Sequence, residues 1–245
     1  MPDFDLDAVR AELAPSGTLV CALNHGNIVL VRRGPTDDTP TGVSVDLARA
    51  LAAALDVPIE FRHYDKAGAV SGSVDTGEWN VCFLAIDPER AKVIAYSEPY
   101  VKIEGAFLVR SGSLAQSSDD IETLQLRIGA VKGSAYELFL SRNGGAGRLT
   151  RFDSFPEAAA ALEAGKLDGL AGVRQAMNRF AADHAGYTVL TEPFMAIPQA
   201  VGVSLTHKIG AAFVAAFVRE MKATGFVRQS LNHSGHRDVI VPGVR

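Results

Sequence analysis

The chain has 245 residues, of which 47% are hydrophobic and 21% are charged, as in an ordinary globular protein with one large or two small domains. Its 24 lysines and arginines are outnumbered by 28 aspartates and glutamates, which gives a net charge of −4. This balance excludes the basic surface that binds nucleic acid or anionic membranes. The longest apolar run, 209–218, has about half of the ~20 residues that a membrane span needs, so we expect no membrane insertion.

The two cysteines and the first residues bear on the cellular compartment. Cys21 and Cys82 each lie in an apolar, strand-like run, which predicts buried reduced thiols rather than a disulfide framework. Residues 1–17 are acidic and predict a short amphipathic helix, without the apolar core of a secretion signal. We therefore expect either that a leader has been removed or that the protein stays in the cytoplasm.

Strand-like and helix-like runs alternate through the first part of the chain. Apolar residues recur at the spacing of one helix face from Val43 to Leu55, between two apolar runs of strand length. In chain order we predict a strand at 18–24, a helix at 43–57, a strand at 57–64, a weak helix broken by Gly68 and Gly72, and a strand at 79–86. This order predicts a parallel sheet covered by helices.

The alternation restarts after the segment GAFLVR at 105–110 and a polar stretch at 111–120. The predicted elements that follow are strands at 126–131, 148–152, 167–173 and 194–204, and helices at 134–142, 154–165, 174–184 and 208–225. We therefore predict two α/β lobes. The first is built from residues 1–110 and 200–245, and the second from residues 111–199.

The dipeptide Asp87-Pro88 follows the strand at 79–86 and has the pattern of a helix start. Arg90 then falls in the first turn, where a cation opposes the helix dipole at a cost of about 0.3–1 kcal/mol. We interpret this placement as a site for an anion, because a carboxylate bound to the guanidinium would offset the cost. A surface salt bridge from Arg90 to Glu89 or Glu98 is the structural alternative.

The second lobe has a matching helix start after the strand at 126–131. Ser134 and Glu137 have the spacing of a capping box. The free N–H groups of such a helix start favour an anion, and ligands of open α/β sheets bind beyond the carboxyl ends of the strands. The alternative is that Ser134 is a plain N-cap without a ligand.

Several segments together resemble one known family. In chain order they are GVSVDLARALAAALDVPIEF, GEWNVCFLAIDPERAKVIAYSEPYV, GAFLVR, LRIGAVKGSAYELF, FDSFPEAAAALEAGKLDGLAGV and the C-terminal ATGFVRQSLN. The run DPERAKVIAYSEPY followed by VKGS is the most specific. The sequence resembles the family 3 bacterial solute-binding proteins, the extracytoplasmic receptors of polar amino-acid ABC transporters.

The resemblance implies a type II periplasmic-binding-protein fold, in which two lobes close over a small ligand, and a periplasmic location. It implies that Arg90 grips the ligand's carboxylate together with the backbone of Ala85. The helix start at Ser134 and Ala135 would bind the same carboxylate. Asn24 and Asn27 match ligand-facing positions after the first strand.

The sequence also departs from the family's pattern. Val173 occupies the position of an acidic residue that holds the ligand's α-ammonium, and the hydroxyl usual at position 85 is absent. An ammonium buried beside Val173 would be an unpaired charge. The ligand is therefore expected to be an acid without the amino group, or to have its ammonium held by Asp87, Glu104 or Glu192. Arg174 either meets a second anionic group of the ligand or is a solvated helix-start arginine.

We therefore predict a solute-binding protein that captures a small carboxylate-bearing ligand, with an ABC permease as the implied partner and with no cofactor. The alternative is a cytoplasmic enzyme or sensor on the same fold, similar to cyclohexadienyl dehydratase. Val173 argues against that dehydratase, because Val173 replaces the acid that the reaction needs. We expect His25 to be a polar loop residue, and expect His233, His236 and Asp238 to be a solvated tail without a metal.

Overall fold

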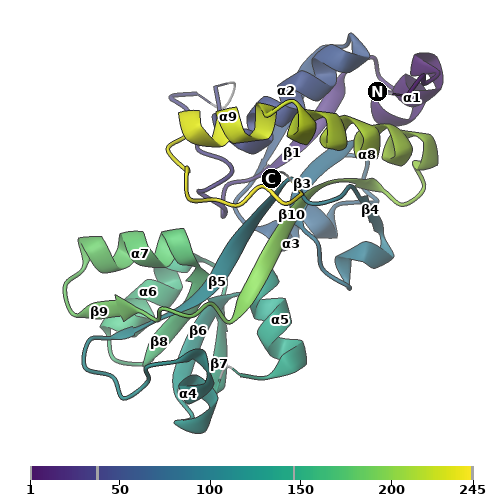
Figure 1. Ribbon diagram of the computed structural model, residues 1–245. Helices are drawn as coiled ribbons and strands as arrows, with labels where there is room; N and C mark the ends of the chain where they lie inside the picture. Colours follow the sequence, from purple (N-terminus) through teal and green to yellow (C-terminus); the bar gives the residue numbers. More distant parts are fainter. Residues whose placement is uncertain (1, 37–38, 146, 244–245) are drawn as a thin grey trace. The chain divides into compact units, whose positions relative to one another are not determined.

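The computed structural model describes residues 2–36, 39–145 and 147–243. The chain divides into two compact units (Figure 1): unit 1 is Met1–Lys102 with Pro198–Arg245, and unit 2 is Ile103–Ile197. The chain passes from one unit to the other inside two long strands, β5 (Val101–Arg110) and β10 (Met195–Ser204).

Unit 1 is a mixed sheet with helices on both faces. Its further strands are β1 (Leu19–Asn24), β2 (Ile59–Tyr64), β3 (Val81–Ala85) and β4 (Ile94–Tyr96), and its helices are α1 (Leu6–Leu13), α2 (Val43–Leu55), α3 (Ala67–Gly72), α8 (Lys208–Ala223) and α9 (Phe226–His233). The strand order is β2-β1-β3-β10, with β4 also paired to β10. β1 is parallel to both β2 and β3, whereas β10 is antiparallel to β3 and β4.

Successive side chains along the strands of unit 1 point to opposite faces of the sheet, and both faces are buried. Ala22, Cys82 and Leu84 pack against Val70 of α3 on one face. Because right-handed crossovers place α2 and α3 on opposite sides of the sheet, α2 covers the other face. Helices α1, α8 and α9 pack with α2 (Figure 1), and both cysteines are free and buried, as predicted.

Unit 2 repeats this plan with a second mixed sheet. Its further strands are β6 (Arg127–Val131), β7 (Arg148–Phe152), β8 (Gly169–Val173) and β9 (Tyr187–Val189), and its helices are α4 (Ser118–Thr123), α5 (Ala135–Asn143), α6 (Phe155–Glu163) and α7 (Arg174–Asp183). The strand order is β5-β8-β6-β7, with β9 also paired to β5. β6 is parallel to β7 and β8, and β5 is antiparallel to β8 and β9.

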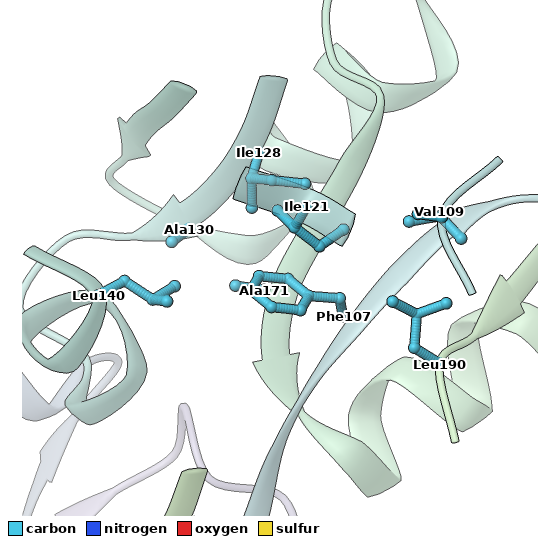
Figure 2. Close-up of a cluster of buried hydrophobic side chains, with 9 residues drawn as sticks. Phe107, Val109, Ile121, Ile128, Ala130, Leu140, Ala171 and Leu190 are labelled. Atoms are coloured by element: carbon cyan, nitrogen blue, oxygen red, sulfur yellow. The ribbon is translucent and has the colours of Figure 1, made fainter. Parts of the chain in front are cut away.

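The core of unit 2 lies on both faces of its sheet, because neighbouring residues of a strand point to opposite sides. Phe107 and Ala171 belong to one buried cluster, in which side chains from β5, β6, β8, α4 and α5 meet (Figure 2). Their neighbours Leu108 and Leu170 belong to the other cluster, which α6 and α7 cover.

Every strand and helix named in chain order above has a counterpart at or near the predicted residues. The sheets are mixed rather than purely parallel, because β5 and β10 run against their neighbours. The sequence patterns missed four short elements: β4, β9, α4 and α9. These strands have three residues and these helices six and eight, so their periodicity is weak; α1 and α3, of similar length, were nevertheless predicted. Among the described residues, no helix has the length and apolar character needed to cross a membrane.

Candidate functional site

Arg90 lies just beyond the carboxyl end of β3 and is almost completely buried, with 3% of its surface exposed. Its Nη1 donates to the backbone oxygen of Ala85, the last residue of β3, at 3.2 Å. Glu89 pairs with Lys92 at 2.6 Å and Glu98 pairs with Lys222 at 2.5 Å. The burial of Arg90 argues against an exposed salt bridge to either glutamate.

The predicted α-helix beginning at Asp87 is wrong. The chain forms only a three-residue 3₁₀ turn, η1 (Arg90–Lys92), before it enters β4. The Asp87 carboxylate accepts a hydrogen bond from Glu89 N–H at 2.9 Å and so closes a local turn. Pairing of Ile94–Tyr96 with β10 ends the turn, since those residues need extended backbone. Three residues carry little helix dipole, so burial, not a dipole penalty, makes the placement of Arg90 notable.

Two titratable side chains lie close enough to Arg90 to be affected by its charge, those of Cys82 and Tyr96. Burial raises the pKa of the Cys82 thiol to about 12, and the positive charge of Arg90 acts against that rise. Burial likewise raises the pKa of Tyr96, again opposed by Arg90, and the charge of Asp87 raises it further. The Tyr96 hydroxyl is buried and has no hydrogen-bond partner among the described residues. Sequence reasoning missed Tyr96, because β4, the strand that carries it, was not predicted.

Asn24 and Asn27 lie at the carboxyl end of β1, beside the end of β3 in the same sheet. Asn24 Oδ1 accepts a hydrogen bond from Gly26 N–H at 3.1 Å, which shapes the turn. Asn27 is 7% exposed, and its Oδ1 is buried without a hydrogen-bond partner among the described residues. A buried acceptor of this kind is costly unless something donates to it.

His25 is more than a polar loop residue, because its Nε2 lies 2.7 Å from Nδ1 of His63 on β2. The two rings are tilted by only 20°, with centroids 5.0 Å apart. The centroid separation is close to the nitrogen–nitrogen distance plus the two ring radii, so the imidazoles meet edge to edge through one hydrogen bond. This hydrogen bond links the turn after β1 to the end of β2.

In unit 2, Ser134 is the N-cap of α5, as predicted: its Oγ accepts a hydrogen bond from Glu137 N–H at 3.2 Å. Ala135 is the first residue of the helix, so its N–H is one of those without a helical acceptor. The capping box is incomplete in its second half, because the Glu137 carboxylate bonds Gly133 N–H at 3.0 Å instead of Ser134 N–H.

Val173 ends β8 and is the N-cap of α7, next to the end of β6 in the same sheet. Arg174, the first residue of α7, donates from Nε to Glu104 Oε2. It also donates from Nη1 to Leu190 O at 3.1 Å and from Nη2 to Thr191 O at 2.9 Å. Arg174 is therefore a structural clamp between α7, β5 and the segment after β9, and Glu104 is engaged with it.

The predicted residues thus gather in two places, each at the carboxyl ends of neighbouring parallel strands. In unit 1 these are Asn24, Asn27, Ala85 and Arg90, and in unit 2 they are Ser134, Ala135, Val173 and Arg174. No group of three or more potential metal ligands occurs within the residues that the structure describes. In the C-terminal segment, His236 Nε2 instead lies 3.1 Å from Arg32 Nη2, and burial followed by the Arg32 charge lowers the pKa of His236.

A family model described as bacterial extracellular solute-binding proteins, family 3, matches residues 32–232 of the chain. A probable histidine-binding protein of Neisseria gonorrhoeae is 29% identical over 133 residues, which are 53% of this chain and 49% of that protein. The membrane-bound lytic murein transglycosylase F of Maricaulis maris is 30% identical over 119 residues, which are 45% of this chain and 26% of that protein. The chain therefore spans half or less of the length of these curated relatives.

Solved structures share the fold over nearly the whole chain. A mutant of the arginine-binding protein ArgBP from T. maritima has a TM-score of 0.78 at 21% identity, covering 93% of this chain and 99% of its own. An amino-acid ABC transporter substrate-binding protein from Streptococcus pneumoniae, bound to L-arginine, has a TM-score of 0.76 at 24% identity, covering 96% and 99%. These likenesses confirm the predicted two-lobed α/β fold of the type II periplasmic-binding proteins.

Proposed function

The chain belongs to family 3 of the bacterial extracellular solute-binding proteins, and from that premise we propose that it captures a small carboxylate-bearing solute for ABC-type uptake. The family model describes solute-binding proteins, although one relative that matches part of the chain is a murein transglycosylase. The implied partner is an ABC permease, and the implied location is the periplasm.

The observation that carries the proposal is the burial of Arg90 at the end of β3. Charged side chains are rarely buried to this extent unless they have a defined task or partner. The bond to Ala85 O fixes one edge of the guanidinium. A carboxylate is the planar partner that matches the fork of a guanidinium, which supports a carboxylate-bearing ligand.

A second element in unit 2 supports the same ligand class. The N-terminus of α5 offers the Ser134 hydroxyl and the Ala135 N–H, and a helix start of this kind favours an anion. The resemblance implies that this helix start binds the ligand's carboxylate, as it implies for Arg90. A double-mutant cycle with Arg90→Ala and Ser134→Ala measures the energetic coupling between the two substitutions in ligand binding.

The identity of residue 173 bears on which carboxylate is bound. A valine cannot pair with an ammonium, and Glu104 is already engaged by Arg174. This favours an organic acid without an α-amino group. The competing ligands are basic amino acids, because one relative is described as histidine-binding and several solved structures hold arginine.

A thermal-shift screen of the purified chain tests the proposal. The panel is L-arginine, L-histidine, other α-amino acids, their deaminated analogues and small dicarboxylates. A ligand at a hundred times its dissociation constant stabilises the protein by ~2.7 kcal/mol, a readily measured rise in melting temperature. A rise with a carboxylate that disappears in its amide or ester supports the proposal. A panel without any stabilising carboxylate contradicts it.

A further inference from the structure

A buried polar network lies beneath the first turn of α5. Glu137 is 3% exposed, and its carboxylate accepts three hydrogen bonds. Oε2 accepts from Gly133 N–H at 3.0 Å, and Oε1 accepts from Ser141 Oγ at 2.6 Å and from Arg151 Nε at 2.7 Å. Arg151 Nη2 also donates to Ser141 Oγ at 2.8 Å. Two neighbours along the chain, Gly133 and Ser141, and one residue of the next strand, Arg151, thus meet at one carboxylate.

Hydrogen bonds made by both the side chain and the backbone of Glu137 hold the turn between β6 and α5. The side chain of Glu137 binds the N–H of Gly133, while the N–H of Glu137 donates to Ser134 Oγ. Ser134 N–H donates to Val131 O at 3.1 Å, which closes the turn itself. Gly133 has φ +74°, in the left-handed region that glycine adopts more readily than other residues.

The charge of Glu137 is balanced locally. Burial by itself would raise the pKa of the carboxyl, but the hydrogen bonds from Ser141, Gly133 and Arg151 outweigh burial, so the pKa lies below its usual value. Arg151 is half exposed and supplies the positive charge. The carboxylate therefore remains ionised near neutral pH without presenting an uncompensated negative charge to an anion at the helix start.

We infer that Glu137 is a positioning residue, which fixes the Gly133–Ser134 turn so that the Ser134 hydroxyl and the Ala135 N–H are preorganised for an anion. The inference rests on the proposed function for its consequence in binding. Preorganisation matters because a donor that must first be ordered contributes less to affinity. The network itself is independent of the ligand's identity.

The chain offers a matched control in α6. Ser154 caps that helix, and Ser154 Oγ accepts from Glu157 N–H, as Ser134 Oγ does from Glu137 N–H. Glu157 is exposed, whereas Glu137 is buried within its network. Comparing Glu137→Ala with Glu157→Ala separates the loss of a first-turn glutamate from the loss of the Glu137 hydrogen-bond network.

The first measurement is the backbone amide of Gly133 in ¹H–¹⁵N spectra of the ligand-free chain. We expect the Gly133 and Ala135 resonances to move and exchange faster with solvent in Glu137→Ala, to be largely restored in Glu137→Gln, and to be unchanged in Glu157→Ala. Gln keeps an oxygen that accepts from Gly133 N–H. Unchanged Gly133 and Ala135 resonances in Glu137→Ala would overturn the inference.

The second measurement is calorimetric affinity for the panel carboxylate that stabilises the wild-type chain most. We expect Glu137→Ala to weaken it by about tenfold or more, because the donors at the helix start are then no longer ordered before the ligand binds. Glu157→Ala should leave affinity within about twofold. Equal losses in both variants would overturn the inference. A chain that binds no carboxylate contradicts the proposed function instead, and the Gly133 amide then remains the test of whether Glu137 holds the turn.

Discussion

The guanidinium of Arg90 is bonded to the backbone oxygen of Ala85, five residues earlier, where β3 ends. The bond turns the side chain back against the sheet and removes it from solvent. A 3₁₀ turn of three residues then suffices to bring the chain into β4. Arg90 is therefore a fixed cation at the carboxyl end of a parallel strand, the edge at which α/β sheets bind ligands.

Replacing Arg90 with alanine should weaken carboxylate binding by about 2–5 kcal/mol, because the ligand's charge would lose its partner in a desolvated site. Arg90→Lys should recover only part of the loss, since a lysine has no planar fork. Calorimetric titration with the best panel ligand measures both. Lys92→Ala, on the same turn but exposed and paired with Glu89, is the control and should bind normally. Normal affinity in Arg90→Ala would show that Arg90 does not bind the ligand's carboxylate.

Replacing Val173 with aspartate should create or strengthen affinity for α-amino acids. A carboxylate at this position would give an α-ammonium a charge-assisted hydrogen bond, worth about 1.5–3 kcal/mol. Val173→Asn, of similar size but neutral, should give much less. The measurement is the change in melting temperature across the panel for each variant. If Val173→Asp leaves amino-acid binding unchanged, the interpretation of residue 173 is wrong.

The ion pair between Asp168 and Arg127 should make the stability of the protein fall in acid. Hydrogen bonds from the Arg127 side chain, outweighing burial, hold the pKa of Asp168 below its usual value. A depressed pKa in the folded state stabilises above the unfolded pKa, and that contribution is lost as the pH falls through the folded pKa. The pair is partly exposed and therefore screened by solvent, so we expect a small contribution.

Urea unfolding of the wild-type chain and Asp168→Asn at neutral pH and below pH ~4 measures this contribution. The variant should be less stable at neutral pH, and the difference should shrink in acid. A constant difference at both pH values would show that the carboxylate's charge does not stabilise the fold.

Replacing Gly202 with alanine should destabilise unit 1 by about 1–3 kcal/mol through overpacking. A Cβ at this position on β10 would lie 2.6 Å from Ile94 Cγ2 and 3.0 Å from Cys82 Sγ. Gly72→Ala is the contrast, because nothing lies within 4 Å of its Cβ and the residue is helical. That variant should stabilise by about 0.4–1 kcal/mol. Thermal unfolding of both variants measures the change in stability, which should be negative for Gly202→Ala and positive for Gly72→Ala. Changes of the same sign would contradict the packing described at these two positions.

The elements that could be predicted from the sequence are those that depend on local pattern. The helix at Val43–Leu55 follows from apolar residues on one face, and the starts at Ser134 and Ser154 follow from side chains that bond their own first turns. The family could also be identified, because motifs in the order of the family cover most of the chain.

Partners that are distant in sequence could not be predicted, since any carboxylate or carbonyl of the chain is a possible acceptor until the strands are placed. Arg174 is bonded to Glu104, seventy residues away, and Glu137 is bonded to Arg151 on β7. The same holds for His25 with His63.

The helix expected at Asp87 does not form, again because of a partner that is distant in sequence. Asp-Pro is a sound local start signal, but Ile94–Tyr96 pairs with Gly202–Ser204 of β10, and that pairing needs extended backbone where the helix would continue. Sequence by itself determined the order of helices and strands, the buried cysteines and the family, because these depend on local periodicity and motif. The tertiary structure alone decided which charges are buried and what they bond, because that depends on which strand ends the fold brings together.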